Sequence, residues 1–410
     1  MNRRRWRRAA AIALVAMTVA CTTTVPPSPT PSTSGEAAPS AASPAAASVA
    51  PAATATPRPT AEPGLASRVE IGTIDPALTN PIGEFRSDAR SIVFASARAE
   101  DAGPNGTPDL WRITPPDGEP ELLWRNPERD HALVVIAGDV GTYAFVDMPL
   151  TGERAWTLWL LPRDATEPIR LDEHPGDEDV SSLVPSVSVN EDTVVWTAFD
   201  RGPAGPVSQL RIAHAPDWEP RTIRELPAAE GELWFPSVAG TALAYVEVHY
   251  LDGGADDERQ VYLTSTIPGS EPQRLDRSGL ATMPLIVDGG VLWKEADEGF
   301  AMMNWGKMFR YDLADGSVRR LSTRPQQWVN YPSAGYRYAA WWGADSFQIG
   351  VYDLLADEAE VLERHSLASD TSALRPHVAG DLLVWLEVVL SPIGERSTLK
   401  YAFLPGPRDP

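Results

Sequence analysis

The chain has 410 residues and a formal net charge of −21, from 56 acidic and 35 basic side chains. Nucleic acids and anionic lipid surfaces bind clusters of lysine and arginine, so this acidity argues against both as partners. The single cysteine, Cys21, excludes an intramolecular disulfide and any site built from paired cysteines.

The first 21 residues have the composition of an export signal. Five arginines between residues 3 and 8 precede an apolar stretch from Ala9 to Ala20. That stretch is shorter than the roughly 20 apolar residues that a membrane-spanning helix needs. Thr18-Val19-Ala20-Cys21 resembles the lipobox of bacterial lipoproteins, with Thr18 in place of the usual leucine. The resemblance implies cleavage before Cys21 and lipidation of its thiol; a plain secreted protein is the alternative.

Residues 22–65 form a segment of a different composition. Threonine, serine, proline, alanine and valine dominate it, and Glu36, Arg58 and Glu62 are its charged residues. Such a segment cannot bury enough apolar surface to offset its ordering entropy, so we predict a disordered tether. Loss of the five signal arginines would move the net charge from −21 to −26. The folded domain is then expected over residues 66–410.

Seven copies of one pattern lie between residues 85 and 403: an apolar run containing an aromatic residue, a polar loop and a second apolar run. The second runs begin 41 to 52 residues apart. In four copies an aromatic residue follows nine residues after a proline, in the pairs Pro236 and Tyr245, Pro284 and Trp293, Pro332 and Trp341, and Pro376 and Trp385. A period of 40 to 50 residues made of short strands is typical of propeller blades. We predict an all-β, seven-bladed β-propeller with four-stranded antiparallel blades, and six blades with an irregular start remain the alternative.

The last copy lacks a segment for a fourth strand. Its chain ends in Leu404-Pro-Gly-Pro-Arg-Asp-Pro410, which cannot supply a ladder of hydrogen bonds, while residues 67–74 precede the first copy unassigned. We therefore predict that residues 67–74 form the outer strand of the last blade and close the ring.

The first copy resembles a known repeat. Residues 85–96, Phe-Arg-Ser-Asp-Ala-Arg-Ser-Ile-Val-Phe-Ala-Ser, followed by residues 109–123, are similar to the WD40-like repeat of TolB-type propellers. Ser87-Asp88-Ala89 lacks the proline and glycine of that family's turn. The resemblance implies a propeller in the periplasm or at the cell surface, and it implies little about activity.

One side of the predicted ring carries the long loops. Turns between first and second strands and between third and fourth strands are short, whereas the other connections are long and emerge together on the opposite side. Aromatic and methionine residues occur there, and exposed clusters of this kind often mark binding surfaces. The candidate binding face consists of Trp234, Phe235, Phe300, Met302, Met303, Trp305, Trp328 and Tyr331. The alternative is that these side chains plug the central channel or cap blade edges.

Signals for catalysis or metal binding are weak. The six histidines fall at different repeat positions, so the repeat does not gather them into a metal shell, and no Gly-x-Ser-x-Gly motif occurs. The acidic stretches 172–179 and 252–258 do not match a calcium loop. His377 follows the proline of an innermost strand and is the one histidine placed to face the channel. We predict no catalytic residue, cofactor or metal.

Two functions follow from these observations. The first is a monomeric, non-catalytic binding or scaffold propeller, tethered outside the cytoplasmic membrane through Cys21, with a protein or cell-envelope polymer as partner. The second is a propeller enzyme acting on carbohydrate, as a lyase or glycoside hydrolase, with carboxylates or a histidine-bound metal at the channel mouth.

Overall fold

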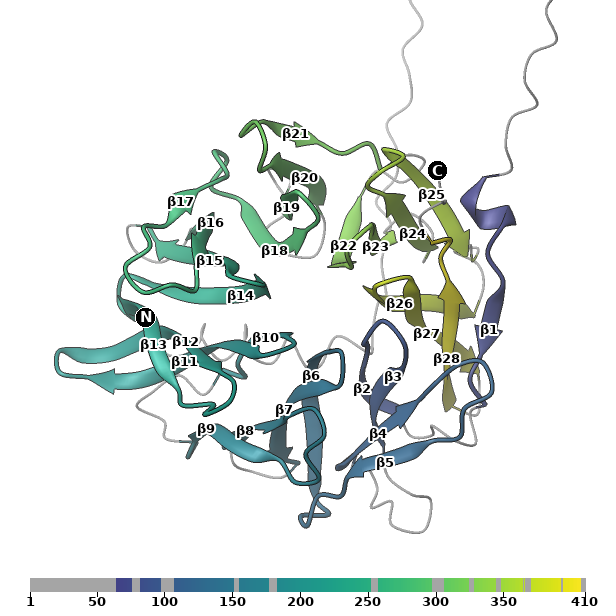
Figure 1. Cartoon of the computed structure of the whole chain (residues 1–410), viewed down its shortest axis with the longest axis horizontal. Coiled ribbons are helices and arrows are strands. Elements are labelled where there is room, and N and C mark those ends of the chain that lie inside the picture. The colour runs from purple at the N-terminus through teal and green to yellow at the C-terminus, as the bar shows by residue number, and fades with distance from the viewer. Residues whose placement is uncertain are drawn as a thin grey trace, which may run out of the picture. The chain divides into compact units, whose positions relative to one another are not determined.

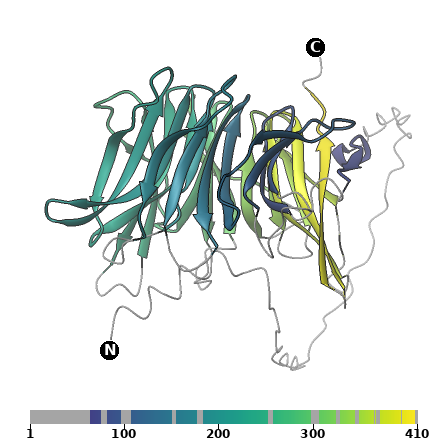
Figure 2. The same cartoon turned by 90° about the horizontal axis from the view of Figure 1, so that it is seen from below.

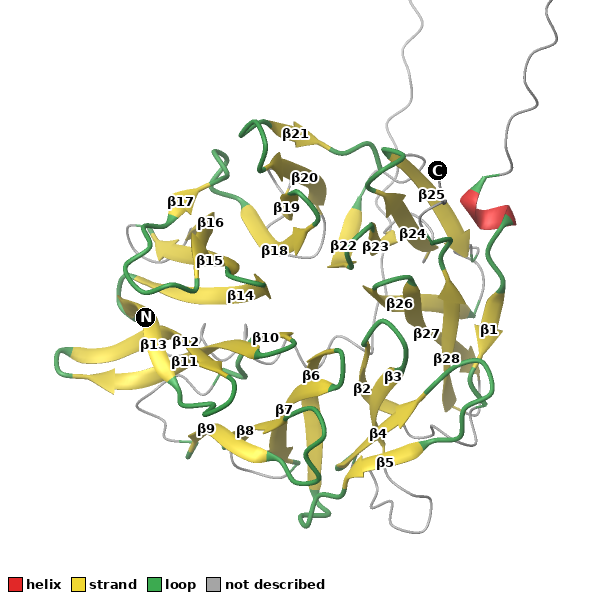
Figure 3. Cartoon of the chain, in the orientation of Figure 1, coloured by secondary structure: helices red, strands yellow, loops and turns green. Residues whose placement is uncertain are grey.

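The computed structural model describes residues 64–75, 82–96, 107–150, 155–176, 183–251, 257–296, 306–323, 328–343, 348–363, 365, 370–391 and 394–406. These residues belong to one compact unit, Pro63–Pro410. They form strands β1 to β28 and one short 3-10 turn, η1 (Leu65–Ser67) (Figure 3). No helix in these ranges has the length and apolar character needed to cross a membrane.

The strands fall into successive groups of four, which we call units. The first unit contains β2 (Ile82–Ser87), β3 (Ile92–Ser96), β4 (Asp109–Ile113) and β5 (Glu121–Trp124). The second contains β6 (His131–Asp139), β7 (Thr142–Pro149), β8 (Trp156–Leu161) and β9 (Ile169–His174). The third contains β10 (Val187–Asn190), β11 (Thr193–Gly202), β12 (Gly205–His214) and β13 (Arg221–Pro227). The fourth contains β14 (Gly231–Ala239), β15 (Ala242–Tyr250), β16 (Asp257–Ser265) and β17 (Gln273–Arg274).

The remaining units follow the same order. The fifth contains β18 (Ala281–Val287), β19 (Gly290–Ala296), β20 (Gly306–Asp312) and β21 (Val318–Arg320). The sixth contains β22 (Val329–Ala334), β23 (Tyr338–Gly343), β24 (Gln348–Asp353) and β25 (Glu358–Glu363). The seventh contains β26 (Thr371–Ala379), β27 (Leu382–Ser391), β28 (Gly394–Phe403) and β1 (Ile71–Thr73).

The units are arranged as the blades of a propeller. Every strand pair within them is antiparallel, and the first strand of each unit lies nearest the ring axis (Figure 1). Figure 2, turned by 90°, shows the sheets from the side, packed next to one another around that axis. Five units are separate four-stranded sheets, while the fifth and sixth are joined into one sheet by the single pair Gly306 and Val329. The predicted all-β propeller with four-stranded blades is confirmed.

The amino-terminal strand completes the seventh unit. β1 pairs with β28, with Ile71 opposite Ala402 and Gly72 opposite Tyr401. A Cβ atom at residue 72 would lie 2.1 Å from the Tyr401 ring, so any larger residue there would force that ring to move. The predicted closure is therefore confirmed.

β1 is shorter than the predicted segment 67–74, and the chain immediately before that segment bonds to another unit. The carboxylate of Glu360 in the sixth unit accepts hydrogen bonds from the backbone N–H groups of Leu65 and Ala66, at 2.5 and 2.8 Å. Leu65 and Ala66 are the first two residues of the 3-10 turn η1. The chain therefore reaches the edge of β28 only at Ile71.

The core lies at the seams, our term for the contacts between successive units. The aromatic residue of each second strand is at most 1% exposed; these residues are Phe94, Tyr143, Trp196, Tyr245, Trp293, Trp341 and Trp385. Trp196, for example, shares a cluster with Leu158 and Leu160 of the second unit. Phe94 of the first unit packs with residues of the seventh in the same way. Second strands are thus buried on both faces, which explains their continuous apolar runs.

A row of hydrogen bonds links the innermost strands. The hydroxyls of Ser188, Ser237 and Ser333 each accept a bond from a backbone N–H of the next unit, at 3.0 to 3.1 Å. In the seventh unit this repeat position holds His377, whose Nδ1 accepts the bond from the Ser87 N–H at 3.2 Å. Burial holds the pKa of His377 well below its usual value, with the Arg86 charge as a second cause. The imidazole is therefore neutral, as an acceptor must be, and it joins the last unit to the first.

Deletion of residues 66–75 tests the closure. The deletion removes β1 and leaves the edge of β28 unpaired. We expect the Tm to fall by at least about 5 °C, because each kcal/mol of lost stability lowers the Tm of a large domain by roughly 2 °C. Differential scanning calorimetry checks this, with deletion of residues 40–49 as the control. An unchanged Tm would contradict a role for β1 in closing the ring.

Replacement of His377 tests the bond at the last seam. His377→Ala leaves the Ser87 N–H without its acceptor and should cost about 1–3 kcal/mol, whereas His377→Ser restores a hydroxyl acceptor and should cost less. An unfolded histidine has a pKa near 6.5 and the native one is lower, so the wild type should lose stability as the pH falls below about 6.5. Urea unfolding at pH 7.5 and 5.5 measures both effects. Equal losses in the two variants, or no change in pH dependence, would argue against this bond.

Candidate functional site

A bulge interrupts the innermost strand of four successive units. In each, the residue before the strand's proline has a positive φ: Phe235 (49°), Met283 (53°), Tyr331 (43°) and Arg375 (53°). The pairing with the second strand skips this residue and its proline, which has no N–H to donate. Such a conformation costs on the order of 1–3 kcal/mol for a non-glycine residue. The bulge therefore holds four side chains of different chemistry at the same repeat position of the innermost strand.

Two of these side chains are exposed. Tyr331 is 39% exposed and stacks on Trp342, with ring centroids 6.4 Å apart. The Arg375 guanidinium lies 3.2 Å from the Glu84 carboxylate, which also pairs with Arg86 at 2.8 Å. The innermost strand of the sixth unit therefore presents an aromatic ring, and those of the seventh and first units present a network of ion pairs.

Trp234 and Phe235 are more firmly anchored. Both are half-buried against the core cluster at the seam between the fourth and fifth units. Their rings contact each other edge to face at 5.5 Å, and the Trp234 indole donates to Glu232 at 2.8 Å. Because β14 runs through both residues, they lie in a strand and not in a loop.

The structure thus places four of the eight residues of the candidate binding face. Tyr331 lies in β22, and Trp328 directly precedes that strand, with the Lys307 ammonium 3.5 Å from its ring centroid. The other four, Phe300, Met302, Met303 and Trp305, lie outside the described residues, as does Cys21. Trp328, Tyr331 and Lys307 all lie near the strand ends from which the long loops emerge.

One buried lysine escaped the sequence analysis. Lys294 in β19 has no exposed surface, and its ammonium lies 3.5 Å from the Asn330 side-chain oxygen across the seam between the fifth and sixth units. Burial, and to a smaller extent the charge of Arg259, lowers the pKa of Lys294 to about 7. The sequence feature that could have predicted this burial is a lysine directly after the apolar residues 291–293.

Two groups of ionisable side chains in the described part of the chain could each supply three ligands to a metal ion. Glu128, Asp130 and His131 form an exposed group, and Glu363, His365 and Glu387 form a partly buried one. The sequence analysis missed both, because it sought histidines at matching repeat positions. Each group instead combines one histidine with carboxylates, and the second group draws them from two units.

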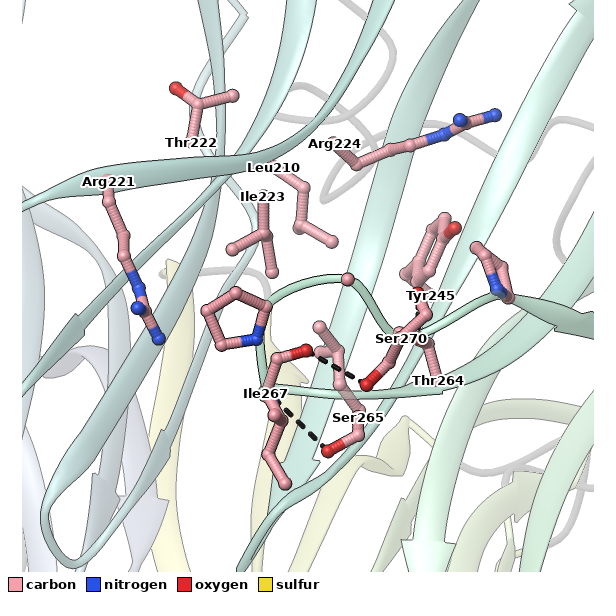
Figure 4. Close-up of a pocket in the computed structure, with 14 residues that line it drawn as sticks. Leu210, Arg221, Thr222, Ile223, Arg224, Tyr245, Thr264, Ser265, Ile267 and Ser270 are labelled. Atoms are coloured by element: carbon pink, nitrogen blue, oxygen red, sulfur yellow. Dashed lines mark hydrogen bonds between the residues drawn. The ribbon is translucent and has the colours of Figure 1, made fainter.

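A pocket of about 250 Å³ lies between the third and fourth units (Figure 4). Its floor is formed by core residues, among them Leu210 and Tyr245. The Arg221 guanidinium at its edge donates to the Thr266 carbonyl at 3.2 Å, and Ser265 and Ser270 bond within their own turn, as Figure 4 shows. The pocket is therefore lined by both apolar side chains and polar groups, and these polar groups already have hydrogen-bond partners.

Comparison with solved structures bears out the fold. The β-propeller domain of the Trilobed protease from Pyrococcus furiosus, for which an open velcro topology is stated, matches with a TM-score of 0.55 and 11% identity, over 80% of this chain and 99% of that one. Oligogalacturonate lyase from Vibrio parahaemolyticus matches with a TM-score of 0.53 and 11% identity, over 82% and 97%. Against the tricorn protease, this chain spans 31% of that protein's length.

TolB from Acinetobacter baumannii also matches, with a TM-score of 0.42 and 15% identity over 79% of each chain. No family model and no curated protein sequence matches the chain. At these identities the likenesses concern the fold alone. The sheet topology, together with the Trilobed protease and lyase structures, shows the chain to have the β-propeller fold predicted from its repeats.

Proposed function

We propose that this protein is an extracytoplasmic binding or scaffold propeller that engages a protein or a cell-envelope polymer through the side of the ring where the long loops emerge. The observation that carries the proposal is that the exposed Tyr331 ring and the Arg375–Glu84 ion pair lie on the innermost strands of three successive units. Bulges in paired strands hold these groups, so little conformational entropy is lost when a partner binds. Aromatic and arginine side chains are also the residues that contribute most to binding at interfaces.

The amino-terminal segments complete this proposal. Lipidation of Cys21 would anchor the chain to a membrane, and residues 22–65 would act as a spacer between the anchor and the propeller. The propeller would then act as a monomer at the cell surface or in the periplasm. The net charge, −21 for the full chain and −26 without the five signal arginines, supports a neutral or basic partner and disfavours nucleic acid.

A second candidate function is catalysis on carbohydrate. The observation in its favour is the partly buried pair Glu363 and Glu387, since glycoside hydrolysis uses two carboxyl groups with separated pKa values. Burial raises the pKa of Glu363, and the charge of Glu387 adds to that effect. Release of products from a panel of polysaccharides, abolished in Glu363→Gln, would favour this function over binding.

The binding proposal is tested by replacing aromatic residues on the two sides of the ring. The double variant Trp305→Ala, Trp328→Ala and the single variant Tyr331→Ala should weaken partner binding by at least about 10-fold, as expected when anchor residues of an interface are lost. Binding is measured by sedimentation with purified peptidoglycan and by affinity capture from envelope extract.

Tyr336→Ala is the matched control. Tyr336 is 70% exposed and lies just beyond the other end of β22, on the side of the short turns. This variant should bind as the wild type does, and melting curves should show that all variants are folded. Equal binding by every variant, or an equal loss in Tyr336→Ala, would argue against the proposed face.

A further inference from the structure

Three ligand-type side chains meet at the seam between the sixth and seventh units. Glu363 ends β25, His365 follows it, and Glu387 lies in β27 of the neighbouring unit. One oxygen or nitrogen atom from each lies within 4.8 Å of the others. All three side chains are partly buried.

The histidine nitrogen in this group has no hydrogen bond among the described residues. His365 Nε2 is buried and lies 3.3 Å from Glu363 Oε1, but the two atoms are not aligned for a hydrogen bond. Two ligands of a tetrahedral zinc ion, each about 2.0–2.1 Å from the metal, are roughly 3.3 Å apart. The spacing of these atoms therefore suits two ligands of one cation.

The surrounding residues orient this group. The Trp385 indole donates to Glu363 Oε2, which leaves Oε1 on the side of His365. A bond to the second oxygen of a ligand carboxylate is the usual support around a metal site. Lys400 lies 3.5 Å from Glu387 Oε1 and is the cation that already faces the group.

The seam between the second and third units offers an internal comparison. By strand register Asp172 corresponds to Glu363, and its Oδ2 likewise accepts a bond from a core indole, that of Trp196, at 2.6 Å. There Arg211 bridges two carboxylates, at 2.9 Å from Asp172 and 2.7 Å from Asp200.

Lys400 holds the repeat position of Arg211, yet it forms its ion pair with Glu387 alone among the described residues. An imidazole lies beside Glu363 instead. At the seam between the second and third units, the Arg211 guanidinium neutralises the carboxylates. At the seam between the sixth and seventh units, Lys400 takes its position and the His365 imidazole, a possible metal ligand, lies beside Glu363.

We propose that Glu363, His365 and Glu387 bind one divalent transition-metal cation across this seam. Imidazole nitrogen favours zinc and carboxylate oxygens accept zinc or manganese, so Zn²⁺ and Mn²⁺ are the expected ions and Ca²⁺ is not. The ion gives His365 Nε2 a partner, separates the two carboxylate charges and ties the sixth unit to the seventh, which β1 completes. This site is independent of the proposed binding face.

The experiment uses the full-length chain after dialysis against EDTA. Isothermal titration at pH 7.5 with ZnCl₂, MnCl₂ and CaCl₂ should give one Zn²⁺ or Mn²⁺ per chain, with a rise in Tm, and weaker binding of Ca²⁺. His365→Gln and Glu387→Gln should each weaken binding by at least about 100-fold, because each removes a direct ligand and loss of a supporting outer-shell partner alone costs about 10- to 100-fold. Melting curves in EDTA establish that both variants are folded.

Two matched variants serve as controls. Glu128→Gln in the exposed acidic group and Asp200→Asn in the comparison seam should bind the metal as the wild type does. Absence of saturable Zn²⁺ or Mn²⁺ binding by the wild type overturns the proposal, and so does binding that survives in both His365→Gln and Glu387→Gln.

Discussion

The propeller depends on the burial of one aromatic side chain per unit against the unit that precedes it. Trp385 packs against the sixth unit, Trp293 against the fourth and Tyr143 against the first, each in a cluster that spans two units. Burying such a side chain contributes about 1.5–3 kcal/mol, and no single sheet can supply the cavity for it. The units are consequently stable together and not alone, and closure of the last seam by β1 matters to all of them.

Because the units pack in this way, the polar side chains that differ from one unit to the next lie at the seams. Two of the buried indoles find their acceptors in different ways: Asp172 accepts from Trp196 across a seam, whereas Glu295 accepts from Trp293 within one strand. Once carboxylates are required there, their charges need partners, and Arg211 is one such partner. The seams thus combine a repeated apolar core with ionisable groups that differ from unit to unit, and these groups give the scaffold its individual chemistry.

The features that the sequence predicted share one physical basis, which is the burial of apolar side chains. The spacing of nine residues between proline and aromatic reflects a bulged first strand followed by a tight turn and a buried second strand. The unassigned segment before the first copy was matched to the missing last strand because every sheet edge needs a partner. The segment was predicted too long by four residues at its beginning, since the bonds from Leu65 and Ala66 to Glu360 depend on a contact 294 or more residues away in sequence.

The sequence by itself therefore determined the fold class, the order of the strands and the way in which the ring closes, because periodic burial is written in local patterns. Only the tertiary structure decided which polar side chains meet. Ser87 and His377 are 290 residues apart, and Glu363 reaches Glu387 from another sheet. These contacts depend on how one sheet packs against the next. The repeat specifies the apolar residues of that packing, but the polar residues around the apolar core differ from unit to unit.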